Sequence, residues 1–282
     1  MDAHLHTALI GSERIRFYER GVGIPLVLIH GMFGDHLDWE SVLEPLSESN
    51  RVIAFDLPGF GESSKPRRDY SEELFTQTLE ELLFQLGIDN AILAGNSFGA
   101  EVAIFYALRR PQSVSKLVLV DSGGFREIAE EERRFVEERF SESAIASLTP
   151  EINAAMFAPV FNSPSKTSTR YLERQNEKLR RPDYPAYAYA LSRSIRLVMN
   201  TYLLDRLQDI QCPTLIVWGE QDRVLPAAQG HLALSRLREG QIKVIPGCGH
   251  APQIECPQAF LDAVQPFLRE TTEGTPPNKT ST

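Results

Sequence analysis

Short apolar runs recur along the chain, separated by stretches with helical periodicity. The main runs lie at residues 25–30, 51–55, 91–94, 117–120, 213–218 and 242–245. Uninterrupted runs of this length are typical of strands that are buried on both faces of a parallel sheet. Residues 6–20 instead alternate apolar and polar positions around Gly11 and Ser12, which predicts an antiparallel hairpin at one edge of the sheet.

Helical patterns fill the intervals between the predicted strands. We expect helices at about 39–46, 71–86, 98–108, 227–237 and 257–269. Ser71 is a candidate N-cap, because a serine side chain can accept a hydrogen bond from the first turn of a helix. Strands that alternate with helices predict an α/β fold in which a mostly parallel sheet is covered on both faces.

The alternation stops between residues 125 and 208. This segment has helical patterns, a charged run at 130–139 and no clean strand. We therefore predict a core domain formed by 1–124 and 209–270, with 125–208 inserted as a helical cap. Ligands bind at the carboxyl ends of parallel strands, and an insertion after residue 124 is placed to cover those ends. The polar, proline-containing residues 271–282 are predicted to form a disordered tail.

Composition and charge narrow the range of partners. Of the 282 residues, 42% are hydrophobic and 24% are charged, as is usual for a globular protein. The net charge of −9 argues against a nucleic-acid or anionic-membrane partner. The three cysteines form no C-x-x-C pair, no signal peptide is recognisable, and no apolar run is long enough to span a bilayer. We expect a cytoplasmic protein that acts on a small molecule without a metal ion or cofactor; nothing in the sequence indicates an oligomeric state.

The segment 95–99 has the pattern G-x-S-x-G, with Ser97 at its centre. It lies between a predicted strand and a predicted helix. A sharp turn there strains the central residue and exposes its side chain, and it requires small residues two positions on either side. A helix N-terminus also favours developing negative charge. Ser97 is therefore a candidate nucleophile.

A serine hydroxyl needs a base to remove its proton, and the base needs a carboxylate to orient it. Among the six histidines, His250 follows the predicted strand 242–245 through a flexible turn at 246–249. His30 is also at a strand end, where we expect it to hold a loop by hydrogen bonds. Asp222 follows the preceding strand and is the predicted acid, with Glu220 and Asp121 as alternatives.

Hydrolysis through a tetrahedral intermediate also requires donors for the negatively charged oxygen. The backbone N–H of Phe98, directly after Ser97, is one candidate. The loop after His30 is expected to supply the second donor from Met32, with Phe33 as the alternative.

Five short motifs resemble those of the α/β-hydrolase superfamily in order and spacing. They are His30-Gly31, Asp56-x-Pro58-Gly59-x-Gly61-x-Ser63, Gly95-x-Ser97-x-Gly99, Gly219-x-x-Asp222 and Gly249-His250. The resemblance covers about residues 13–269 apart from the insertion. It implies an eight-stranded sheet, a helical cap, and a triad of Ser97, Asp222 and His250 in that chain order.

Within the superfamily, the serine nucleophile resembles that of carboxylesterases and lipases. It differs from the aspartate of haloalkane dehalogenases and epoxide hydrolases. Carbon–carbon bond hydrolases of ring-cleavage products also carry Gly-Asn-Ser-x-Gly, but they usually have Gly where this chain has Ala100 and Trp where it has Ala251. Cofactor-free perhydrolases and receptor-like binding proteins of the same fold are further alternatives.

The predicted cap is rich in aromatic and apolar residues, which predicts a hydrophobic acyl pocket. We expect Phe33, Phe157 and Tyr187 to contact the substrate. The favoured function is therefore hydrolysis of carboxylic esters with a short to medium acyl chain.

Overall fold

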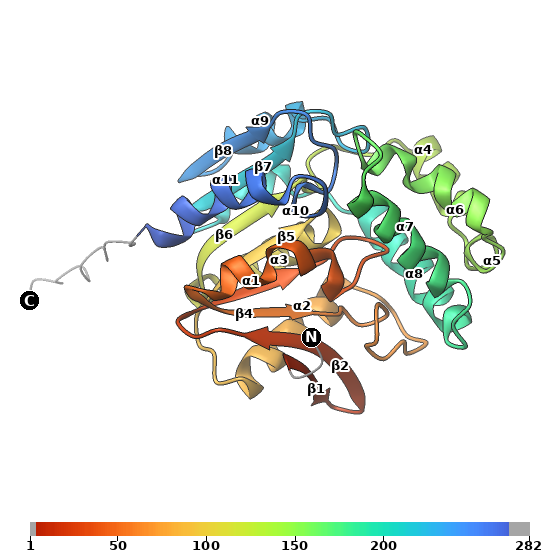
Figure 1. Ribbon diagram of the computed structural model, residues 1–282, viewed down its shortest axis with the longest axis horizontal. Helices are drawn as coiled ribbons and strands as arrows, with labels where there is room; N and C mark the ends of the chain where they lie inside the picture. Colours follow the sequence, from red (N-terminus) through yellow and green to blue (C-terminus); the bar gives the residue numbers. More distant parts are fainter. Residues whose placement is uncertain (1–3, 271–282) are drawn as a thin grey trace, which may run out of the picture.

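An eight-stranded sheet forms the centre of the computed structural model, which describes residues 4–270 (Figure 1). The predicted tail at 271–282 lies outside the described residues. The strand order is β1-β2-β4-β3-β5-β6-β7-β8; β1–β2 and β2–β4 are antiparallel, and the other neighbours are parallel. The strands are β1 (Leu5–Ile10), β2 (Glu13–Arg20), β3 (Ile24–Ile29), β4 (Asn50–Phe55), β5 (Ala91–Asn96), β6 (Val114–Val120), β7 (Thr214–Gly219) and β8 (Gly240–Ile245). The predicted fold class, including the edge hairpin, is confirmed.

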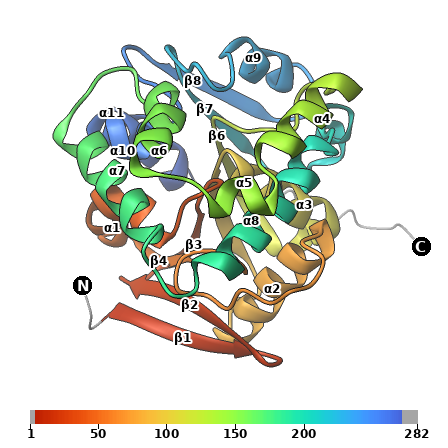
Figure 2. The same cartoon turned by 90° about the vertical axis from the view of Figure 1, so that its right-hand side faces the viewer.

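Helices cover both faces of the sheet (Figures 1 and 2). α1 and α11 pack on one face, where Trp39 and Phe260 are buried against Leu28 and Val118. α2 and α3 pack on the other face. The helices outside residues 130–199 are α1 (Glu40–Ser47), α2 (Glu72–Gln85), α3 (Phe98–Arg109), α9 (Ala228–Leu234), α10 (Pro252–Glu255) and α11 (Pro257–Arg269), with short 3₁₀ turns η2 (His36–Trp39), η3 (Pro111–Ser113) and η5 (Leu204–Asp209).

Local signals in the sequence explain where several of these helices begin. Ser71 caps α2 by accepting a hydrogen bond from Leu74 N at 3.3 Å, as predicted. Helix α10 has only four residues and starts at Pro252. This helix was not predicted from the sequence, because a single helical turn carries no periodicity.

A helical insertion lies beyond the carboxyl ends of the strands and forms the green part of Figures 1 and 2. It comprises α4 (Glu130–Arg139), α5 (Glu142–Ala146), α6 (Pro150–Phe157), η4 (Ala158–Val160), α7 (Lys166–Lys178) and α8 (Tyr184–Met199). Ser165 and Ser168 form a reciprocal capping box at the start of α7. Every helix within residues 4–270 is too short or too polar to span a membrane.

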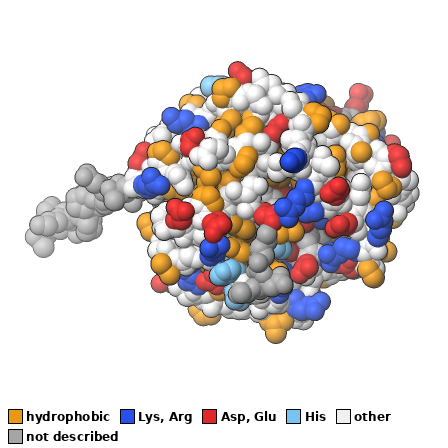
Figure 3. Space-filling view, viewed as in Figure 1, with side chains coloured by type: hydrophobic (Ala, Val, Ile, Leu, Met, Phe, Trp, Pro, Cys, Tyr) orange, Lys and Arg blue, Asp and Glu red, His pale blue; other side chains and the backbone are white. Residues whose placement is uncertain are grey.

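Acidic and basic side chains are interspersed on the face drawn in Figure 3. Many charged side chains of residues 4–270 form ion pairs, such as Arg20 with Glu44 and Arg51 with Glu19. On this face the acidic side chains therefore do not form a continuous negative patch that would attract a polyvalent cation.

Candidate active site

Ser97 occupies a strained turn between β5 and α3. Its backbone has φ 53° and ψ −116°, a region that L residues other than glycine rarely adopt. A Cβ at Gly95 would lie 2.2 Å from Gly99 O, and a Cβ at Gly99 would lie 2.2 Å from Ile29 O. Both small residues are required by the turn, as the G-x-S-x-G pattern predicts.

His250 and Asp222 form a short hydrogen bond at the ends of β8 and β7. His250 Nδ1 donates to Asp222 Oδ2 at 2.7 Å. The other oxygen of Asp222 accepts hydrogen bonds from Val224 N at 2.7 Å and from Leu225 N at 2.9 Å. The carboxylate is thereby fixed from both sides, and Nε2 of the imidazole is left as the basic nitrogen.

Within residues 4–270 neither of the two alternative acids is hydrogen-bonded to His250, although the carboxylate of Asp121 lies within 4.8 Å of the paired atoms of Asp222 and His250. Glu220 is exposed, and its carboxylate accepts a hydrogen bond from the Gln221 side chain. Asp121 is fully buried and accepts from Gly219 N at 2.9 Å. Burial, reinforced by the charge of Asp222, raises the pKa of Asp121 well above its usual range. Burial therefore favours the uncharged form of Asp121, and Asp222 is the acid that bonds to the imidazole.

The backbone around His250 is held from two directions. Asn96 Nδ2 donates to His250 O at 3.2 Å, and it also donates to Val120 O at 3.2 Å. From the insertion, Val160 O accepts a hydrogen bond from His250 N at 2.7 Å. The histidine loop is thus connected to both the core and the cap.

The loop after β3 has a defined shape. Gly34 N donates to Gly31 O at 3.1 Å, and Phe33 has φ 68°. Lys178 on α7 donates to Phe33 O at 2.7 Å and forms an ion pair with Asp35 at 2.8 Å. The cap therefore fixes the loop that carries the predicted donor Met32.

His30 is buried at the start of this loop. Its Nε2 accepts a hydrogen bond from Leu57 N at 3.0 Å, so Nδ1 carries the proton and donates to Gly31 O at 2.8 Å. Burial lowers the pKa of His30. A neutral imidazole with both nitrogens occupied joins two loops, which is the role that the sequence analysis expected.

Two cavities meet at Ser97. One, here called the Glu101 cavity, has a volume of about 250 Å³ and extends past Phe98 and Glu101 towards α4 and α8. The other, here called the His250 cavity, has a volume of about 210 Å³ and extends past His250 towards α6 and α7. Met32 lines both cavities, whereas Phe98 lines the Glu101 cavity.

The three predicted substrate contacts are placed differently. Phe33 lines both cavities, and Phe157 lines the His250 cavity with its ring edge-on to that of Phe33 at 5.3 Å. Tyr187 lines neither cavity and instead packs against Phe60 of the core at 6.1 Å. The prediction for Tyr187 is corrected: α8 points this side chain at the core, while Ile195 and Val198, further along the helix, face the Glu101 cavity.

Three of the cavity-lining residues that were not predicted from the sequence bear on the site. Phe140 and Val224 line both, but neither belongs to a motif. Glu101 lines the larger cavity and is the only charged residue in the otherwise apolar stretch 98–108. That isolated charge could have been recognised in the sequence, because acidic residues are rarely buried in an apolar helix unless they are paired or functional.

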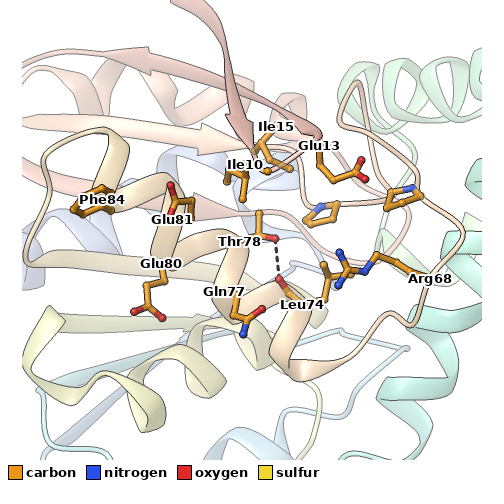
Figure 4. A pocket seen from close by; sticks show the side chains of 13 residues that line it. Ile10, Glu13, Ile15, Arg68, Leu74, Gln77, Thr78, Glu80, Glu81 and Phe84 are labelled. Carbon is orange, nitrogen blue, oxygen red and sulfur yellow. Dashed lines mark hydrogen bonds between the residues drawn. The ribbon is translucent and has the colours of Figure 1, made fainter.

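Other hollows and clusters do not contain Ser97. A groove of about 730 Å³ lies between the β1–β2 hairpin and α2, lined by Ile10, Glu13, Leu74 and Phe84 among others (Figure 4). Cys248, Glu255 and Cys256 have possible metal-ligating atoms within 4.8 Å of one another, as do Asp121, Asp222 and His250. Burial raises the pKa of the Cys248 thiol, which opposes the thiolate form that binds metals.

Comparison with known proteins identifies the family. A profile of the alpha/beta hydrolase fold matches residues 24–257. An uncharacterized protein of Mycobacterium tuberculosis is 31% identical over 275 residues, which cover 94% of this chain and 80% of the relative. A 2-hydroxy-6-oxo-6-(2'-aminophenyl)hexa-2,4-dienoic acid hydrolase of Metapseudomonas resinovorans is 27% identical over 263 residues, which cover 92% and 88% of the two chains.

The solved structures agree with this assignment. The crystal structure of a membrane phospholipase A, described as a bacterial virulence factor, matches with a TM-score of 0.81 and 29% identity, covering 94% of this chain and 86% of that one. The family match, the eight-stranded sheet and the strained serine turn lead to one conclusion: this chain belongs to the alpha/beta hydrolase fold family and is a hydrolase.

Proposed function

We propose that this hydrolase cleaves carboxylic esters with a short to medium acyl chain, through an acyl-enzyme intermediate on Ser97. The observation that carries the proposal is the meeting of two separate cavities at Ser97, one of which also contains His250. An ester has two parts on either side of its carbonyl carbon. Two cavities that meet at one nucleophile match that shape.

In the first step His250 Nε2 takes the Ser97 proton while Ser97 Oγ attacks the ester carbonyl. The hydrogen bond from Nδ1 to Asp222 stabilises the imidazolium that forms. The backbone N–H groups of Met32 and Phe98 hold the oxyanion. Each such donor contributes about 2.7–4 kcal/mol at the transition state.

The position of His250 assigns the two cavities to the two parts of the substrate. The imidazolium must give its proton to the departing alkoxide oxygen, so the alcohol leaves beside His250. We therefore assign the alcohol to the His250 cavity and the acyl chain to the Glu101 cavity. His250 then takes a proton from water, and the resulting hydroxide equivalent releases the acid from Ser97.

Carbon–carbon bond cleavage is the second candidate. It is favoured by the similarity to the dienoic acid hydrolase across 92% of the chain. Ala100 and Ala251 depart from the residues usual in such hydrolases. Ala251 lines the His250 cavity, where a methyl group leaves open the space that a tryptophan would fill.

A chain-length series of 4-nitrophenyl esters tests the proposal, with Ser97→Ala as the control and a dienone ring-cleavage product in the same panel. We expect hydrolysis of the short and medium esters and labelling of Ser97 by a fluorophosphonate probe, both abolished in Ser97→Ala. Ester rates no higher than those of Ser97→Ala would exclude ester hydrolysis. Cleavage of the dienone alone would select the second candidate.

A further inference from the structure

Glu101 differs from the other buried carboxylates in having no visible partner. Its side chain is 1% exposed, and its Oε2 is buried without a hydrogen-bond partner among residues 4–270. Each of the other buried acids in this part of the chain accepts at least one hydrogen bond, although Oδ2 of Asp121 also has no partner; these acids are Asp35, Asp38, Asp56, Asp121 and Asp222. A buried polar group without a partner destabilises the protein, and a bound ligand that supplies the missing hydrogen bond would remove this cost.

The carboxyl of Glu101 lies in the wall of the cavity that bears its name. A Cβ at Gly123, which lines the same cavity, would lie 2.1 Å from Glu101 Oε1. The absence of a side chain at Gly123 therefore makes room for the carboxyl. Most of the remaining wall is apolar, with contributions from Phe140, Ile195 and Met199.

Two other polar side chains of this cavity already have partners. Arg126 binds Glu132 with its guanidinium, and the Thr201 hydroxyl donates to Leu197 O at 2.8 Å. Gln229 is half-buried. The Glu101 carboxyl is the fully buried polar group of the cavity wall.

Glu101 also lies close to the nucleophile along the helix. Its backbone N–H donates to Ser97 O at 3.3 Å, one turn of α3 away. Residues four apart share a helix face, and helical side chains tilt towards the N-terminus. Ser97 and Glu101 also line the same cavity, so an acyl group attacked by Ser97 can place an oxygen substituent beside Glu101.

Burial raises the pKa of Glu101 well above its usual range. Burial thus favours the uncharged carboxylic acid, which has one O–H donor and a carbonyl acceptor. Such a group can satisfy a hydroxyl or a keto oxygen without placing a charge in an apolar wall.

We propose that Glu101 is a hydrogen-bonding subsite for an uncharged hydroxyl or keto oxygen, carried by the substrate acyl group close to its carbonyl. This inference rests on the ester hydrolysis proposed above. It names the acyl class: short acyl chains with an oxygen substituent near the ester carbon, with the alkyl remainder against the apolar wall. Glu101 is a specificity-determining residue in this proposal and takes no part in bond cleavage.

The test compares two esters that differ by one oxygen, 4-nitrophenyl 3-hydroxybutyrate and 4-nitrophenyl butyrate. The readout is the ratio of kcat/KM for the two esters, because it does not depend on how much of a preparation is folded. In Glu101→Met, which keeps the length of the side chain, we expect the ratio to fall about tenfold relative to wild type. Glu101→Gln, whose amide also donates and accepts, is expected to keep the ratio within about threefold.

Glu138→Met is the matched control, because Glu138 is an exposed carboxylate on α4 of the cap; its ratio should equal that of wild type. If Glu101→Met does not fold, Glu101→Ala applies the same test with a smaller side chain. A ratio in the apolar variants within twofold of wild type would overturn the inference and leave ester hydrolysis intact. A wild-type enzyme that cleaves neither ester, in a preparation that fluorophosphonate does not label, would instead overturn the proposed function.

Discussion

The two cavities that meet at Ser97 have walls of different construction. The wall of the His250 cavity is connected to the core by polar contacts: Val160 O accepts from His250 N, and Arg174 forms an ion pair with Asp38 at 2.8 Å. In the Glu101 cavity the outer wall comes largely from α4 and α8 through apolar contacts, and no residue of α4 is buried.

This difference suggests that the two cavities have different roles: proton transfer takes place beside the His250 cavity, and the Glu101 cavity selects the acyl chain. Atoms that transfer protons must be held in place to within a fraction of an ångström, and hydrogen bonds and ion pairs provide that directionality. An acyl chain requires only space and apolar contact, which a loosely held helix can supply. We therefore expect changes around the His250 cavity to affect rate and stability, and changes around the Glu101 cavity to affect substrate preference.

The largest effect is expected for Asp222→Asn. The asparagine amide cannot hold the imidazole in the tautomer that leaves Nε2 basic, so kcat should fall by about 10⁴ while the fold is retained. Steady-state kinetics on a 4-nitrophenyl ester, with circular dichroism as the check on folding, measures this. Asp121→Asn is the matched control and should lose less than about tenfold, because Asp222 is the residue bonded to His250. An equal or greater loss in Asp121→Asn would assign the acid role to Asp121.

The next largest effect is expected for the ion pair between Arg174 and Asp38 in the wall of the His250 cavity. Arg174 and Asp38 are 15% and 5% exposed, and removal of one partner from such a buried pair leaves an uncompensated charge. Burial raises the pKa of Asp38 to about 6, against the opposing influence of Arg174. Arg174→Met should therefore lower the free energy of unfolding by about 3 kcal/mol at pH 8. The loss should be smaller at pH 5, where Asp38 is protonated.

Arg170→Met is the control for that variant. Arg170 pairs with Glu40 on the same side of the cap, but its side chain is 65% exposed. Surface pairs of this kind contribute less than about 1 kcal/mol. Urea titrations of both variants at the two pH values measure the difference. Equal losses for Arg170→Met and Arg174→Met would show that the wall of the His250 cavity is not held by its buried ion pair.

A third pair of variants tests which part of the substrate each cavity receives. Val198 lines the Glu101 cavity and Val160 lines the His250 cavity. Val198→Phe should lower kcat/KM about tenfold for octanoate esters relative to butyrate esters. Val160→Phe should leave that ratio unchanged and discriminate instead against bulky alcohols. The opposite pattern would exchange the two assignments.

The smallest effect is a pH dependence of stability. The pKa of Glu101 is raised in the folded protein by burial, so the folded state binds its proton more tightly than the unfolded state does. Stability then falls as the pH rises above the pKa of the unfolded chain, since the unfolded state binds fewer protons there. Glu101→Gln removes this titration. The variant should gain stability relative to wild type between pH 5 and pH 8.5, as measured by urea unfolding; a constant difference across that range would contradict the burial of an uncharged acid.

Much of the fold was predictable from patterns along the chain. The buried strands, the edge hairpin, the Ser71 cap and the helical insertion all leave local signals, because burial and capping select residue types at fixed spacing. The strained turn at Ser97 was also predictable, since a Cβ at Gly95 or Gly99 would lie 2.2 Å from a backbone oxygen.

The errors fall on features that depend on packing between distant segments. Tyr187 was expected at the substrate, but the rotation of α8 directs it to Phe60. Helix periodicity shows which positions share a face, but it does not show which neighbour that face meets. Phe140 and Val224 were missed for a similar reason, because each lines the cavities at Ser97 only through the tertiary fold: Phe140 from the cap, and Val224 from the loop after β7.

Local chemistry in the chain therefore established the sheet, the insertion and the identity of the strained serine, because those depend on residues close in sequence. The sequence already favoured Asp222 over Asp121 as the acid. The hydrogen bond from His250 to Asp222, the polar support behind His250 and the unpartnered carboxyl of Glu101 emerged only in three dimensions. Each of these depends on burial and on contacts between residues far apart in sequence. The same carboxylic acid is a charged surface group or a neutral hydrogen-bond donor according to what surrounds it.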